Sequence, residues 1–161
     1  MSVTVPFDVR LEPELPPSSR APAPFDTRLL DALLKLDWGD VEYDLIFEIG
    51  GLTYGYYPDE VITVMGSIVR EIERFRSRED HTLLIIGYPV LDVRFEGDMA
   101  VFLDPTTGGS RRLKLLGVGR VPASVVLAAL DRLAWSLWDH VQSIQSDAGK
   151  APDPAAPTAG G

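Results

Sequence analysis

Residues 41–49 alternate between two kinds of side chain, and no other stretch constrains the fold as strongly. The odd positions carry apolar or aromatic residues, and the even positions carry carboxylates, except for Ile46. A period of two is typical of a half-buried β-strand, so we expect one face to enter a core and the other to present carboxylates to water. Gly50 and Gly51 follow directly and allow the positive φ angles of a two-residue hairpin turn. The stretch therefore predicts a hairpin with a short return strand over residues 52–56.

Hydrophobic periodicity predicts the remaining elements. Apolar residues at steps of three and four predict helices, and apolar residues at steps of two predict strands. The expected helices begin near residues 25, 58 and 121, and the later strands cover residues 82–86, 91–96, 99–103 and 113–115. Strands joined by such short turns must be antiparallel. We predict an α+β fold, with an antiparallel sheet of five or six strands, helices mainly on one face, and the order α-β-β-α-β-β-β-β-α.

Composition divides the chain into three parts. Residues 1–24 are rich in proline, which removes backbone donors and does not fit a helix interior, so they predict an arm or linker. The alternation of Val3, Val5, Phe7 and Val9 equally allows an edge strand there. Residues 25–145 form the single expected domain. Residues 146–161 are rich in Ala, Pro and Gly and are expected to be a disordered tail.

Charge and cysteine content narrow the class of partner. The chain of 161 residues has a formal net charge of −9 and no cysteine. The acidic balance argues against nucleic acid and anionic membranes as main ligands, and the lack of cysteine rules out disulfides. No apolar segment approaches the roughly 20 residues that span a bilayer, and no basic and apolar leader opens the chain. These features predict a cytoplasmic protein.

Patterns typical of catalysis or cofactor binding are absent from the sequence. His81 and His140 have no second histidine or carboxylate at helical ligand spacing beyond their direct neighbours. Gly108 and Gly109 lead into an expected strand rather than a helix, which argues against a phosphate-binding loop. Asp92 and the acids that follow it are explained by a solvated strand face and by turns. The sequence predicts a protein that is not an enzyme and has no cofactor and no metal site.

The strongest functional candidate is the stretch around the first hairpin, because residues 37–60 contain carboxylates and aromatic rings but no Lys or Arg. A rigid acidic hairpin can meet a basic protein surface and associate faster through complementary charge, and tyrosines add contact area. A solvated sheet face explains the same carboxylates equally well. The candidate partner-binding residues are Asp40, Glu42, Asp44, Glu48, Tyr54, Tyr56, Tyr57 and Trp135.

Trp135 belongs to this set for a separate reason. At about 100° per residue, Val126, Leu130 and Leu137 share one face of the last helix, and Trp135 falls about 160° from the centre of that face. A tryptophan on the polar side of a helix needs a second surface. That surface is either the N-terminal arm or first helix of this chain, or a partner protein for which the ring is an anchor.

In layout, residues 44–133 resemble the small acidic α+β immunity proteins that neutralise bacterial polymorphic toxins. The resemblance rests on the strand end Phe47-Glu48-Ile49-Gly50-Gly51, the turn Phe95-Glu96-Gly97-Asp98 and the closing helix led by Pro122. It implies a cytoplasmic inhibitor that occludes the active site of a toxin. The first contacts it implies are Glu42, Asp44, Glu48 and the tyrosines.

Two other interpretations stay open. A secretion chaperone or adaptor is also small and acidic, holds an effector segment through exposed apolar surface, and is commonly a homodimer through a helix. Trp135 and the loose chain ends suit it equally well. An enzyme of an unrecognised type is third, and the lack of a convergent set of titratable side chains argues against it.

Overall fold

The structure is a computed structural model that describes residues 4–21, 23–35, 41–55, 58–85, 88–104 and 116–150. Helices and strands follow one another along these residues. Their order is β1 (Phe7–Glu12), α1 (Leu29–Leu33), β2 (Glu42–Ile49), β3 (Leu52–Tyr54), β4 (Asp59–Glu60), α2 (Val61–Ser77), β5 (His81–Ile85), β6 (Tyr88–Glu96), β7 (Met99–Asp104), β8 (Leu116–Pro122) and α3 (Ala123–Lys150).

The strands form two antiparallel sheets of four strands each, so the fold is α+β. The first sheet has the order β1-β2-β3, with the short β4 paired to the opposite end of β2. The second has the order β5-β6-β7-β8. The predicted single sheet of five or six strands is therefore wrong, and the predicted order lacks β1 and β4. β1 lies in the proline-rich stretch and β4 has two residues, too few to carry a period of two.

The two sheets meet at the N-terminal end of β1. Thr4 forms an isolated parallel bridge with Arg120 of β8, and the Val5 N–H donates to the Arg120 carbonyl over 3.0 Å. Gly119 has no side chain at the point where Val5 packs on β8. Beyond Arg120 the pairing stops, because Pro122 has no N–H to donate and the chain enters α3 directly after it. The bridge places the strands in the sequence β5-β6-β7-β8-β1-β2 across the molecule.

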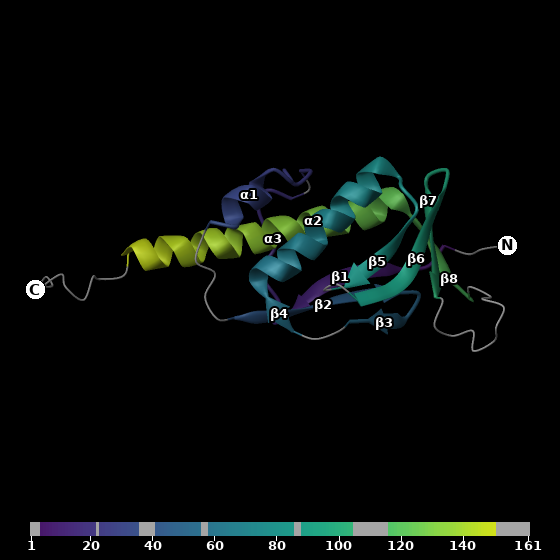
Figure 1. Ribbon diagram of the computed structural model, residues 1–161, viewed down its shortest axis with the longest axis horizontal. Coiled ribbons are helices and arrows are strands. Elements are labelled where there is room, and N and C mark those ends of the chain that lie inside the picture. The colour runs from purple at the N-terminus through teal and green to yellow at the C-terminus, as the bar shows by residue number, and fades with distance from the viewer. Residues whose placement is uncertain are drawn as a thin grey trace, which may run out of the picture.

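Helices α2 and α3 pack against each other and lie on one side of the sheets (Figure 1). The side chains of α2 at steps of three and four are buried, as the periodicity predicted. The strands contribute their inward-facing residues to the same core. The core includes Leu45, Phe47, Val61, Met65, Ile68, Ile72, Phe75, Leu83, Leu91, Phe102, Val126, Leu130 and Leu137. On the opposite face of β1 and β2, Asp8, Glu12 and Glu42 are exposed to solvent.

The last helix, α3, has 28 residues and is about 42 Å long. It runs to Lys150, so residues 146–150, which were expected in the tail, are helical, and residues 151–161 lie outside the described part of the chain. Its C-terminal part extends beyond the sheets (Figure 1). Over the ranges that the structure describes, no helix is long and apolar enough to cross a membrane.

Candidate functional site

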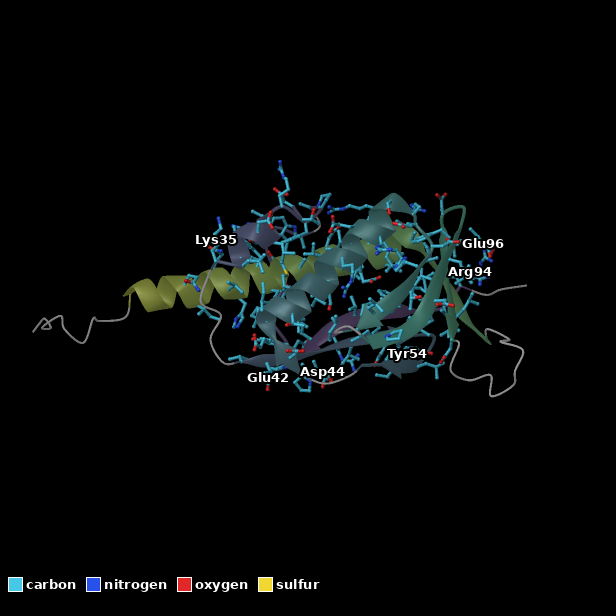
Figure 2. The ribbon with its side chains drawn as sticks, viewed as in Figure 1. Lys35, Glu42, Asp44, Tyr54, Arg94 and Glu96 are labelled. Carbon is cyan, nitrogen blue, oxygen red and sulfur yellow. The ribbon has the colours of Figure 1, made fainter. Side chains whose placement is uncertain are left out.

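Strand β2 shows the alternation that its sequence predicted. Tyr43, Leu45 and Phe47 are buried on the inner side, whereas Glu42 is exposed and lies with Asp44 on the side away from the helices (Figure 2). Ile46 is the exception, because it faces outward and yet is only 7% exposed. The backbone at Gly55 covers it so closely that a Cβ there would lie 3.2 Å from Ile46 Cγ1.

The pairing register adds carboxylates from two further strands to this outer face. Side chains that are directly opposite in an antiparallel pair point to the same side of the sheet. The register places Asp8 opposite Glu48, Glu12 opposite Asp44, and Glu42 opposite Glu60. We call this set the acidic face. It consists of Asp8, Glu12, Glu42, Asp44, Glu48 and Glu60, carried by β1, β2 and β4.

The acidic face is electrostatically unfavourable for the fold itself. Like charges directly opposite each other across a strand pair destabilise a sheet, and the face contains three such pairs. Arg10 is the only basic residue in β1, β2, β3 and β4. It lies 2.8 Å from Glu48, 3.4 Å from Glu12 and 3.7 Å from Asp8. Within these four strands, one cation therefore serves three carboxylates.

The hydrogen bond to Glu48 is the largest effect on the Arg10 guanidinium and raises its pKa; burial, the next largest, lowers the pKa, and the bond to Glu12 raises it. Arg10 is opposite Ile46 and so stands between the two acidic pairs of β1 and β2. The net charge of the face stays strongly negative at neutral pH.

Tyr54 is not part of the acidic face. It pairs with Phe47, so its side chain lies on the inner side of the sheet, whereas that of Glu48 lies on the outer side. Burial, together with the nearby Asp104 carboxylate, raises the pKa of the Tyr54 hydroxyl. Of the other predicted contacts, Asp40, Tyr56 and Tyr57 lie outside the described residues.

Trp135 is covered by the N-terminal part of the chain. Its Nε1–H donates to the Ala23 carbonyl over 2.8 Å, and its ring meets Phe25 edge-on with 4.8 Å between centroids. The Arg20 guanidinium lies 5.4 Å from the ring centre and pairs with Asp139 over 2.8 Å. Of the two surfaces that the sequence left open, the arm of the same chain is the one found. Trp135 lies on α3, whereas Glu42 and Asp44 of the acidic face lie on the side of the sheet away from the helices (Figure 2).

The structure brings together Glu42, Asp44 and Glu48, which the sequence had singled out, and adds Asp8 and Glu12 from β1. The sequence did contain a sign that Asp8 and Glu12 lie on a strand face, because they alternate with apolar residues that the strand buries. The alternating stretch is flanked by prolines, and it does not indicate which strand it pairs with. The register with β2, which sets the acids opposite one another, is a property of the tertiary fold.

The far edge of β1 forms a second feature of this region. The Gly50 N–H donates to the Pro6 carbonyl over 3.0 Å, so even-numbered residues of β1 direct their backbone groups to β2. Odd-numbered residues must direct theirs to the opposite edge, as Val5 does toward Arg120. Over the described ranges, no hydrogen bond joins the edge-facing backbone groups of Val9 or Leu11 to another part of the chain.

A groove of about 320 Å³ lies along this edge, between β1 and α3. One wall is β1 from Asp8 to Leu11, and the other is the α3 segment that includes Ala129, Leu133 and Ser136. Leu15 and Pro17 line the groove beyond the C-terminal end of β1. The groove is therefore bounded by a sheet edge on one side and a helix on the other.

No family model, curated protein or solved structure matches this chain. In the part that the structure describes, no group of three or more His, Asp and Glu residues is placed to hold a metal ion.

Proposed function

We propose that the protein binds a basic surface of another protein through its acidic face. The observation that carries this proposal is the set of six carboxylates in three directly opposed pairs, among which these strands place a single cation, Arg10. Like charges held directly opposite one another in a sheet are unfavourable for folding, and such an arrangement is typical of a functional surface. A cationic partner would neutralise the charges and relieve the repulsion.

The rigidity of the surface supports the same proposal. The carboxylates stand on strands rather than loops, so little backbone entropy is lost when a partner docks. A negative surface also steers a basic partner and raises its association rate. Lys35 lies near α1 on the helical side of the molecule, away from Glu42 and Asp44 (Figure 2). The described charges are thus arranged unevenly around the fold.

The specific form that we propose is inhibition of a basic toxin, as in the immunity proteins that the sequence resembles. In that form the acidic face would cover the active site of the toxin. The carboxylates of β2 that the sequence singled out are the central contacts, and those of β1 extend the contact surface.

The test is affinity capture of partners from the lysate of the native host, with a charge-reversed variant beside the native protein. The variant is Glu12→Lys with Glu42→Lys. Each lysine would face one remaining carboxylate, Asp44 or Glu60, and Arg10 would lose its pair with Glu12 but keep its shorter pair with Glu48, so the fold should be retained. We expect one stoichiometric basic partner whose affinity falls about tenfold in the variant and falls further with added salt.

A matched control carries the same charge change on another surface. Asp31 on α1 and Glu73 on α2 are both exposed, so Asp31→Lys with Glu73→Lys alters net charge equally without touching the acidic face. Equal loss of binding in both variants would show that net charge alone is responsible. Unchanged binding in the Glu12 and Glu42 variant would refute the proposal.

A chaperone or adaptor that holds an extended segment is the second candidate function. The unpaired edge of β1 and the groove beside it are the specific observations in its favour. Both functions use β1, one through the side chains of its outer face and the other through its backbone.

A further inference from the structure

Strand β7 is apolar on both of its faces, unlike the strand β6 beside it. Ala100 and Phe102 are buried in the core. Met99, Val101 and Leu103 alternate with them, are partly exposed, and point to the outer side of the second sheet. We call these three residues the apolar stripe, and none of them is among the described side chains that pack against the core. A continuous apolar run is typical of a strand that is covered on both sides, so the stripe calls for a second surface.

The charges around the apolar stripe are balanced, which distinguishes this surface from the acidic face. On the same side, β6 carries Asp92, Arg94 and Glu96, the register partners of the three stripe residues. Arg120 of β8 pairs with Glu96 over 2.7 Å. Asp92 accepts a hydrogen bond from the Thr82 hydroxyl, whereas Arg94 has no ion pair or hydrogen bond over the described ranges. Two acids and two bases share the surface, so neither a strongly basic nor a strongly acidic partner matches it.

We propose that two copies of this chain form a dimer by packing the outer faces of their second sheets against each other. The inference goes beyond the proposed function, because the acidic face belongs to the other sheet. Figure 2 shows Arg94 and Glu96 well away from Glu42 and Asp44. A twofold dimer requires a surface that is complementary to itself, and two sheets pack face to face at a separation of about 10 Å.

The register of β6 and β7 shows how this surface complements itself. Asp92 is level with Leu103, and Arg94 is level with Val101, two residues away along the same strands. A twofold axis that crosses the strands between these two levels turns the surface over and exchanges the levels. Arg94 of each copy then faces Asp92 of the other copy, and Val101 faces Leu103. Two ion pairs and two apolar contacts result from one rotation.

The other charged residues of the surface tolerate the same rotation. Along β8, Arg120 is level with Val101, and Gly117 is level with Leu103. The rotation therefore places Arg120 of one copy opposite Gly117 of the other. Glu96 lies one level further out and stays paired with Arg120. Among the described charges of this surface, no like charges are opposed.

The size of the surface sets the expected affinity. Four strands about 4.8 Å apart, with about six residues each, give a surface on the order of 15 Å by 20 Å. This area lies at the lower end of specific interfaces. The formal net charge of −9 on each chain also opposes association at long range. We expect a dimer with a dissociation constant on the order of 10 to 100 μM at about 0.15 M salt.

Sedimentation velocity of the full-length protein, from roughly 5 to 500 μM, measures the dimer. Arg94→Asp and Asp92→Arg should each weaken it at least about tenfold, because each substitution acts twice across the axis and sets like charges opposite each other. The matched controls are Arg132→Asp on α3 and Asp31→Arg on α1. They make the same changes in charge at exposed positions elsewhere and should leave the affinity within about twofold of native.

A mixture of the two single variants is the most specific test of the pairing. In an equimolar mixture of Arg94→Asp and Asp92→Arg, one chain has two acids at these positions and the other has two bases. Every pair across the axis is then attractive. The mixed dimer should form with about native affinity, although each variant alone dimerises poorly. The double variant D92R/R94D should also recover the dimer, and recovery requires that the substituted chains are folded.

Val101→Thr tests the apolar stripe. Threonine is also β-branched and suits an outward strand position, so the fold should be retained, as far-UV circular dichroism and thermal unfolding would check. A hydroxyl would replace a methyl group near the centre of the interface in both copies. We expect the dimer to weaken at least about fivefold.

Several outcomes would overturn the inference. A protein that stays monomeric over this concentration range would do so, and so would a dimer that Val101→Thr and both charge variants leave unchanged. Weakening in the single variants without recovery in the mixture would refute the pairing of Arg94 with Asp92. Equal weakening in the matched controls would attribute the effect to net charge. The Glu12→Lys, Glu42→Lys variant alters only the acidic face and should still dimerise, so failure of either proposal leaves the other standing.

Discussion

The Nε2 atom of His81 lies 2.7 Å from Oε1 of Glu71, and the two side chains are 3% and 1% exposed. The other ring nitrogen, Nδ1, lies 2.7 Å from the Glu79 carbonyl and must donate to it. Phe75 and Phe95 pack against the ring. Burial opposes the charged imidazole, but the hydrogen bond and charge of Glu71 outweigh it with the help of Glu79, so the pKa of His81 is raised despite nearby Arg74. The pair joins the C-terminal half of α2 to the start of β5.

This pair predicts a loss of stability as pH rises. Because the folded-state pKa of His81 is raised above its ordinary value of about 6.5, the folded protein binds this proton more tightly than the unfolded chain. The stabilisation should be complete below about pH 6.5 and should disappear as pH rises through the folded-state pKa. Urea unfolding between about pH 5.5 and 9 measures it.

Glu71→Gln tests how much of this pH-dependent stability comes from the pair of His81 and Glu71. The variant should be less stable than the native protein by about 2 kcal/mol at the acidic end, with the difference shrinking toward alkaline pH. His140 has the opposite effect on the pH dependence of stability. Burial lowers its pKa, so its contribution to folding stability is lost as pH falls. Both proteins keep His140, so it cancels in the comparison. A difference that does not vary with pH would contradict the prediction.

Asp131 should be one of the most sensitive polar positions in the chain. It is 5% exposed, accepts the Phe25 N–H over 3.0 Å, and pairs with Arg76 over 3.1 Å. Asp131→Ala leaves Arg76 without its carboxylate partner and the Phe25 N–H without its acceptor, so we expect a loss of about 3 kcal/mol in urea unfolding. Asp139→Ala breaks only the exposed pair with Arg20 and should cost less than about 1 kcal/mol. Equal costs would contradict the assignment.

A methyl group added at Gly119 should destabilise the junction between the two sheets. A Cβ at Gly119 would collide with the side chain of Val5, so Gly119→Ala should destabilise the protein by about 2 kcal/mol. Val5→Ala removes the colliding atoms at the cost of some packing. The double variant should therefore lose less stability than the sum of the two single variants, as measured by thermal unfolding. Strict additivity would indicate that the two residues do not meet.

Glu42→Lys should stabilise the fold while it weakens partner binding. The lysine would stand opposite Glu60 and turn a repulsive pair into an attractive one, worth about 0.5 kcal/mol. Thermal unfolding at low salt measures the gain, and added salt should reduce it. Glu42→Gln, which removes the repulsion without adding attraction, should give a smaller gain. A lower stability for Glu42→Lys would mean that Glu42 serves the fold rather than binding.

The hydrophobic pattern predicted an element correctly where the residues of that element alone showed its periodicity. The buried face of β2 and the buried stripe of α2 follow from spacing alone, because the side-chain period of a strand or helix is set by its own backbone. β4 has two residues and carried no such evidence, whereas β1 showed an alternation that allowed an edge strand but stood beside prolines that equally allowed an arm. The strands form two sheets because Pro122 ends the pairing between β8 and the N-terminal end of β1. This effect depends on β1 lying beside β8, which the sequence does not show.

The sequence by itself determined the α+β class, the carboxylates on the outer side of β2, and the amphipathic faces of α2 and α3, because these are properties of neighbouring residues. Only the tertiary structure decided that Asp8 and Glu12 join those carboxylates, that Tyr54 faces inward, and that Trp135 lies under the arm. Each of these depends on a contact between segments far apart in the chain. Register and packing between such segments are set by the whole core rather than by any local period.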